Sequence, residues 1–131
     1  MKVILFFALT MVVLVSLLPG CKGDDLGLEI KLAPIHEVQI SIAESFPEQI
    51  FVHITGGLAD SCTIFHDLTT ERTGNTIKIE VTTERPKDAV CAQVYGYFEK
   101  SVSLGSDFTS GQRYLVDVNG TTETFEYPQN N

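Results

Sequence analysis

Residues 113–127 read RYLVDVNGTTETFEY, and they give the clearest indication of the fold in the chain. Before the Asn119-Gly120 pair, the large apolar residues fall at every second position: Tyr114, Val116 and Val118. That spacing is typical of a strand with one buried face. Asn-Gly is the strongest short signal for a type I′ turn, which joins two antiparallel strands. With residues 122–127 as the second strand, the stretch predicts a β-hairpin.

The chain upstream of this hairpin repeats the same period-two pattern. Its clearest example is Ile77, Ile79 and Val81, which alternate with polar residues. Five further strands are expected, near residues 37–42, 49–55, 61–66, 77–82 and 94–104. No segment after residue 21 has the periodicity of an amphipathic helix. Seven short strands predict an all-β, antiparallel sandwich, and a small β-barrel is the alternative.

The composition excludes several classes of protein. The 131 residues hold 9 Lys and Arg against 17 Asp and Glu, a formal net charge of −8. Nucleic-acid-binding domains need a basic surface, so no nucleic-acid partner is expected. The hydrophobic fraction of 44% is too high for a disordered chain, and 3 cysteines are too few for a small multi-disulfide scaffold. The length suits a single domain.

The N-terminal residues have the layout of an export signal. Lys2 is the only charged side chain among residues 1–20, and it precedes an uncharged run over residues 3–18. At about 1.5 Å per residue, a helix of that length is shorter than the roughly 30 Å hydrocarbon core of a bilayer. The run therefore favours a cleaved signal over a permanent membrane span.

The signal segment ends in Leu18-Pro19-Gly20-Cys21, which resembles the lipobox of bacterial lipoproteins. In that family an aliphatic residue at −3 and a small residue at −1 precede a cysteine that is acylated and becomes the new N-terminus. Pro19 departs from the pattern, because position −2 usually takes a small or β-branched residue. The resemblance implies fatty acids such as palmitate on Cys21 and an extracytoplasmic protein anchored in the cell membrane or outer membrane. Plain secretion and an uncleaved anchor are the alternatives.

The resemblance also divides the chain. Residues 1–20 are expected to be the signal peptide, 21–34 the lipidated cysteine and its tether, 35–128 the β-sandwich domain and 129–131 a tail. Residues 26–32 (LGLEIKL) could instead form an additional edge strand.

The residues before the hairpin carry a second resemblance. Residues 104–113 (LGSDFTSGQR) lead into Tyr114, as a glycine-containing turn leads into the sixth strand of immunoglobulin-like and fibronectin-like domains. The resemblance implies a seven-stranded sandwich of that type in which the Tyr114 hydroxyl bonds to backbone upstream. An ordinary strand tyrosine with its ring in the core is the alternative. Similar small domains occur in uncharacterised bacterial lipoproteins, and the likeness brings no activity with it.

The two remaining cysteines are expected to pair. If the strands run alternately up and down, Cys62 at the start of the third strand and Cys91 before the fifth lie at the same end as the tether. An exported domain can form a disulfide there, closing a loop of about 30 residues. Two free thiols are the alternative. The Asn119-Gly120 turn is expected at this same end, and the loops near residues 44–48, 70–75 and 105–112 at the other, which we expect to face outward.

The residues suited to catalysis or metal binding form no recognisable motif. His36, His53 and His66 lack the spacing of a zinc site, and His66 is expected toward the end opposite the other two. A nucleophile elbow, a phosphate loop and a dinucleotide fingerprint are absent from the sequence. No catalytic residue, metal, cofactor or enzyme activity is therefore expected.

The segment containing Tyr95, Tyr97 and Phe98 is the best candidate for binding. Successive strand residues point to opposite faces, so Tyr97 and Phe98 cannot both lie in the core. One aromatic face could bind a partner or ligand, and burial under an edge loop is the alternative. We therefore expect a non-enzymatic binding or interaction module that meets the membrane through Cys21 and an unknown protein partner. An exported protease inhibitor that uses the loops at one end of the sandwich is the alternative.

Overall fold

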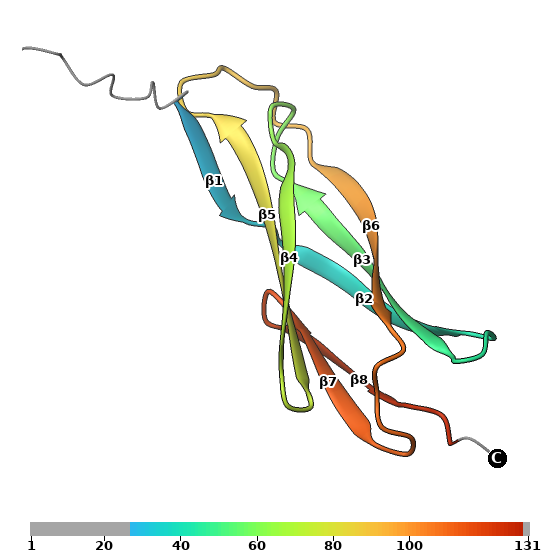
Figure 1. Ribbon diagram of the computed structural model, residues 1–131. Coiled ribbons are helices and arrows are strands. Elements are labelled where there is room, and N and C mark those ends of the chain that lie inside the picture. The colour runs from blue at the N-terminus through green and yellow to red at the C-terminus, as the bar shows by residue number, and fades with distance from the viewer. Residues whose placement is uncertain (1–26, 130–131) are drawn as a thin grey trace, which may run out of the picture.

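The computed structural model describes residues 27–129 and folds them into two facing β-sheets (Figure 1). Its strands are β1 (Leu28–Leu32), β2 (Ile35–Ala43), β3 (Gln49–Leu58), β4 (Ile64–Thr73), β5 (Thr76–Pro86), β6 (Gly96–Gly105), β7 (Arg113–Val118) and β8 (Thr121–Glu126). The described residues are all-β, so the sandwich prediction is confirmed. Within them, no helix is long and apolar enough to cross a membrane. The predicted signal peptide and Cys21 lie outside the described residues.

The smaller sheet has the order β2-β3-β6, and the larger one is built around β5. On one edge β5 pairs with β4 along almost its whole length. Its other edge is shared by two strands laid end to end: β1 pairs with residues 82–86 and β7 with residues 76–79. β8 pairs with the outer edge of β7.

The expectation of a purely antiparallel sandwich is wrong at one pair of strands. β7 runs parallel to β5, whereas the other pairings are antiparallel. The reason lies in the alternation itself. β5 runs one way, β6 returns in the other sheet, and β7 then runs in the direction of β5. Strands two apart in such an order are parallel wherever they become neighbours.

The structure has eight strands where seven were expected. The additional strand, β1, lies inside the predicted tether, at the position that sequence analysis left open as an edge strand. It forms because the outer half of β5 has a free edge: five residues of β1 pair there, and the Ala33 N–H then donates to the Val81 carbonyl at 2.9 Å. The strand expected over residues 61–66 is shifted and forms β4, with the predicted turn at Gly74 (φ 61°) following it.

The strand expected over residues 49–55 is longer than predicted, because β3 continues through Gly56 and Gly57 to Leu58. Gly56 is needed here for space. A Cβ atom added to it would lie 2.1 Å from Cζ of Phe98, whose ring sits directly over the glycine. The ring also packs edge-on against Phe65 of β4, with ring centroids 5.6 Å apart. Gly56 therefore lets one aromatic residue close the edge between the two sheets.

The core is formed by alternating aliphatic residues of both sheets and by aromatic rings near the end of the hairpin. Its fully buried members are Ile50, Val52, Ile54, Ile77, Ile79, Val81, Tyr114, Val116 and Val118. Tyr114 also makes the predicted upstream contact, because its hydroxyl accepts a 2.9 Å hydrogen bond from the Thr109 N–H. That bond lowers the pKa of Tyr114, against the opposing effect of burial. The predicted hydrogen bond between the Tyr114 hydroxyl and upstream backbone is thus confirmed.

Asn119 joins β1 and β7 into one continuous edge. Its Nδ2 donates to the Ala33 carbonyl at 2.9 Å and to the Val81 carbonyl at 2.7 Å, and its Oδ1 accepts from the Val81 N–H at 3.0 Å. The side-chain amide therefore stands where the peptide group of a strand residue would be. Asn119 (φ 49°) and Gly120 (φ 92°) have the two positive φ angles of a type I′ turn. The turn lies against the middle of β5, not at the end of the sandwich as expected (Figure 1).

Candidate functional site

The outer surface of the sheet β2-β3-β6 presents a regular strip of side chains, which we name the polar face. The pairing register sets them in rows across the three strands. One row is Glu37, Thr55 and Glu99; the next is Gln39, His53 and Ser101. Neighbouring strands lie about 4.8 Å apart, so the two glutamates stand roughly 10 Å apart across β3. Outward positions of all three strands thus form one surface.

The polar face is hollowed between its flanking strands. An open hollow of about 420 Å³ is lined by seven residues: Glu37, Gln39, His53, Thr55, Glu99, Lys100 and Ser101. His53 lies on the central strand, and its Nε2 is 2.8 Å from the Ser41 hydroxyl. Carboxylate, amide, hydroxyl and imidazole groups there are open to solvent, and such groups orient a bound ligand by hydrogen bonds.

An aromatic trio, His36, Tyr95 and Tyr97, closes one end of the polar face. The three rings meet edge-on with centroids 5.3–5.7 Å apart, and His36 Nε2 lies 2.6 Å from the Tyr95 hydroxyl. Tyr97 is 65% exposed and Tyr95 46% exposed. Gly57 forms the floor, because a Cβ atom there would lie 1.9 Å from the Tyr95 hydroxyl oxygen. Aromatic side chains that are rigidly packed yet solvent-exposed are common at binding surfaces.

The structure decides between the two interpretations of the aromatic segment. Phe98 packs against the core, and Tyr97 points to the solvent on the opposite side of β6. The interpretation with an exposed aromatic face is the one that the structure supports. The polar face was not predicted from the sequence, although the period-two pattern gave each outward position. Only the register between β2, β3 and β6 shows that these positions share a row.

The three histidines do not converge. His36 contacts Tyr95 and His53 contacts Ser41, whereas His66 Nδ1 lies 2.6 Å from Glu84 Oε2. The expected position of His66 near the opposite end is wrong. β4 begins only at Ile64, so His66 lies near its start, in the half of the sandwich that holds the disulfide.

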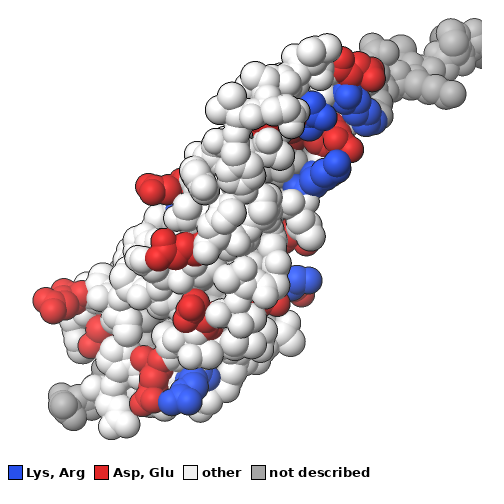
Figure 2. Space-filling view, turned by 180° about the vertical axis from the view of Figure 1, so that it is seen from behind, with Lys and Arg blue, Asp and Glu red and all other residues white. Residues whose placement is uncertain are grey.

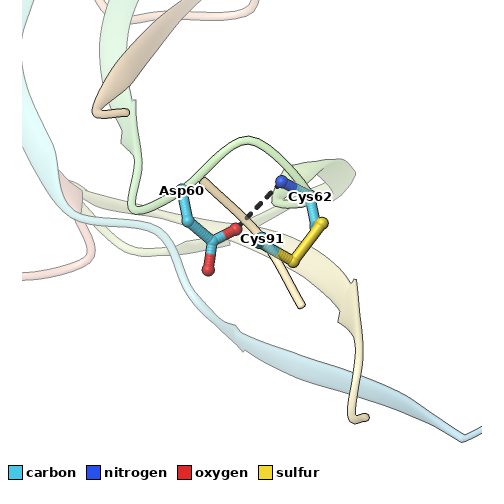
Figure 3. Close-up of side chains that lie close together, drawn as sticks. All are labelled: Asp60, Cys62 and Cys91. Carbon is cyan, nitrogen blue, oxygen red and sulfur yellow. Dashed lines mark hydrogen bonds between the residues drawn. A yellow bond between two sulfur atoms is a disulfide. The ribbon is translucent and has the colours of Figure 1, made fainter. Parts of the chain in front are cut away.

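A disulfide joins Cys62 and Cys91, the pair that sequence analysis selected, with Cα atoms 5.7 Å apart (Figure 3). Beside it, one carboxylate oxygen of Asp60 accepts from the Cys62 and Thr63 N–H groups, each at 3.0 Å, and from the Thr63 hydroxyl at 2.8 Å. Its other oxygen pairs with Arg85 at 3.2 Å. The Thr63 hydroxyl, opposed by burial and aided by the Cys62 N–H and Arg85, lowers the pKa of Asp60.

Metal binding at this cluster is disfavoured by its chemistry. Among the described residues, Asp60, Cys62 and Cys91 form the one group of three ligand-type atoms that lie within 4.8 Å of one another. Thiolates bind metals, whereas both sulfurs here are bonded to each other, and Asp60 already has four hydrogen-bond or ion-pair partners. The cluster fixes the β3–β4 loop to the β5–β6 loop.

Comparison with known proteins identifies relatives. An uncharacterised 10.2 kDa protein in the HgiCIIM 5′ region of Herpetosiphon aurantiacus is 44% identical over 92 residues, which are 70% of this chain and 97% of that protein. A second uncharacterised 10.2 kDa protein of that organism, in the HgiBIM 5′ region, is 43% identical over 82 residues, 63% of this chain and 99% of the relative. No solved structure matches the chain. Residues 52–127, from β3 to the end of the hairpin, match the model of the ORF11 β-sandwich domain. The chain therefore belongs to the ORF11 β-sandwich domain family.

Proposed function

We propose that this protein is a membrane-anchored, extracytoplasmic lipoprotein whose β-sandwich is a non-enzymatic binding module. The observation that carries the binding role is the polar face. It combines an open hollow, two glutamates in one row and an aromatic trio with exposed tyrosines. The anchoring role rests on the lipobox-like residues Leu18 to Cys21.

Acylation would place the domain close to the membrane. Residues 22–27 separate Cys21 from the start of β1 at Leu28. At no more than about 3.5 Å per residue, that segment spans roughly 25 Å at full extension. Two or three acyl chains on one cysteine hold a protein stably on a bilayer, because each buried CH₂ contributes about 0.8 kcal/mol.

Labelled fatty acid tests the anchor. The wild-type protein is expected to incorporate labelled palmitate and to sediment with membranes, and Cys21→Ala to do neither. Label that persists in Cys21→Ala would contradict the assignment of the acylated residue.

Site-specific photocrosslinking tests the binding face. A photoreactive phenylalanine analogue at Tyr97 is expected to give a discrete cross-linked product in native membranes. The same analogue at Leu115, which is 37% exposed on the outer face of the larger sheet, is the matched control. Equal products from both positions, or none from Tyr97, would argue against a binding role for the polar face.

A further inference from the structure

The chain enters the domain beside the loop that connects β5 and β6. Leu28 pairs with Pro86 at the end of β5, and the Lys87 N–H donates to the Gly27 carbonyl at 2.7 Å. We name this end of the sandwich the entry end. In Figure 1 the β5–β6 loop crosses it, directly beside the point where β1 begins.

The β5–β6 loop presents apolar side chains to the solvent at the entry end. Val90 is 102% exposed and Val94 is 64% exposed. The backbone between Val90 and Val94 is fixed at two residues, and this holds both side chains at the surface. Cys91 is held by the disulfide, and Ala92 exchanges hydrogen bonds with Ser61: its carbonyl accepts at 3.1 Å and its N–H donates at 2.9 Å to the hydroxyl.

The neighbouring strands carry two further exposed aliphatic side chains near this end. Ile30 of β1 and Ile64 of β4 are 53% and 55% exposed, and both lie opposite Glu84 in the register of the larger sheet. Both side chains therefore lie on one face of the larger sheet, and Ile30 is two residues from the start of β1 at the entry end. Exposed aliphatic residues gathered at one end of a soluble domain indicate a surface that becomes covered.

The charges near the entry end are of both signs. Figure 2 shows Lys and Arg side chains near the entry end with Asp and Glu side chains among them, and more Asp and Glu than Lys and Arg over the rest of that view. Lys31 pairs with Glu29 at 3.0 Å and Arg85 with Asp60 at 3.2 Å, so neighbouring acids balance these two cations. The closeness of this end to the anchor, rather than its charge, therefore favours a lipid surface as the cover.

We propose that the entry end rests on the phospholipid bilayer, with Val90 and Val94 at the level of the headgroups. The proposal rests on acylation of Cys21, and the short connection supplies its main argument. Residues 22–27 hold the entry end within roughly 25 Å of the anchor, so the Val90 loop meets the membrane surface repeatedly. The polar face then lies along the side of a domain that stands on the bilayer.

The test uses the absence of tryptophan from the chain, which makes an introduced tryptophan a unique fluorescent reporter. The processed full-length protein is reconstituted into phosphatidylcholine and phosphatidylglycerol vesicles that contain a lipid with a headgroup nitroxide. Val90→Trp is the reporter and Val94→Trp a second one. Phe46→Trp is the matched control, because Phe46 is 92% exposed on the β2–β3 loop at the opposite end.

Val90→Trp is expected to shift its emission to shorter wavelength on reconstitution and to lose most of its emission to the nitroxide lipid. Val94→Trp is expected to show a smaller loss, and Phe46→Trp none. Equal quenching of Val90→Trp and Phe46→Trp would overturn the proposal, since it would show a freely tumbling domain. A wavelength shift without quenching would also overturn it, because protein would then cover the loop.

Palmitate labelling and vesicle flotation separate this proposal from the anchoring proposal. A protein that incorporates label and floats, yet shows no quenching at Val90→Trp, refutes the bilayer contact alone. A protein that neither incorporates label nor floats refutes the anchor, and the bilayer contact fails with it.

Discussion

Replacing Asn119 tests whether one side chain joins the N-terminal strand to the C-terminal hairpin. Asn119→Ala removes three hydrogen bonds to Ala33 and Val81, with donor–acceptor distances of 2.7–3.0 Å. A typical intramolecular hydrogen bond contributes about 1 kcal/mol net, so the three together contribute about 3 kcal/mol. Alanine in the left-handed region at φ 49° costs about 1 kcal/mol more. The expected loss in the free energy of unfolding is therefore about 4 kcal/mol.

Asn119→Gly separates the two contributions. Glycine adopts positive φ without strain, so this variant is expected to lose the hydrogen bonds alone, about 3 kcal/mol. Urea unfolding followed by circular dichroism measures the free energy of unfolding of all three proteins. The urea midpoint should be highest for wild type, lower for Asn119→Gly and lowest for Asn119→Ala. A loss below about 1 kcal/mol in both variants would refute the reasoning, because it would show that β1 and β7 hold their places without Asn119.

Three further changes test other parts of the structure. Reducing the disulfide, which spans 29 residues of sequence, is expected to lower the free energy of unfolding by roughly 3.5 kcal/mol in the chain-entropy model. As a control, the Cys62→Ala/Cys91→Ala variant should have the same urea midpoint with and without reductant. Gly56→Ala forces the packed Phe98 ring to move and should lower the free energy of unfolding by roughly 1–3 kcal/mol. Gly57→Ala displaces only exposed ends of the aromatic trio and should lower it by less. Equal urea midpoints for the two variants would contradict this. Because the folded-state pKa of Asp60 lies below 3.8, its carboxylate stabilises the fold above that pH and loses this effect as the pH falls through the lowered pKa. The gap in urea midpoint between wild type and Asp60→Asn should therefore narrow below pH 3.8, and a constant gap would contradict the assignment.

Much of the fold follows from local signals in the sequence. The alternation through Ile77, Ile79 and Val81 indicates a strand that is buried on one face. The Asn119-Gly120 pair indicates the type I′ turn between β7 and β8. The up-and-down order then brings Cys62 and Cys91 together without any further assumption. These features depend on residues that are close in sequence, or only on the direction in which each strand runs.

The remainder depends on contacts between distant residues. β1 is too short and too mixed in charge to show a strand pattern by itself, and it exists because the outer half of β5 offers a free edge. The Asn119-Gly120 turn lies against the middle of β5 because β7 pairs only with residues 76–79. The polar face likewise requires the register of β2, β3 and β6, which pattern analysis of single strands does not contain.

The hydrogen bonds by which Asn119 joins β1 and β7 also affect its deamidation, a slow chemical modification of asparagine. In a flexible chain, the nitrogen of a glycine that follows asparagine attacks the side-chain carbonyl carbon, releasing ammonia and forming a succinimide. Here the Asn119 carboxamide is fixed by three hydrogen bonds, and the Gly120 N–H donates to the Asp117 carboxylate at 2.7 Å. Both reacting groups are thus held in place while the domain is folded. The sequence most prone to deamidation in this chain is protected by the same contacts that close its sheet, and it becomes reactive when the hairpin separates from β5.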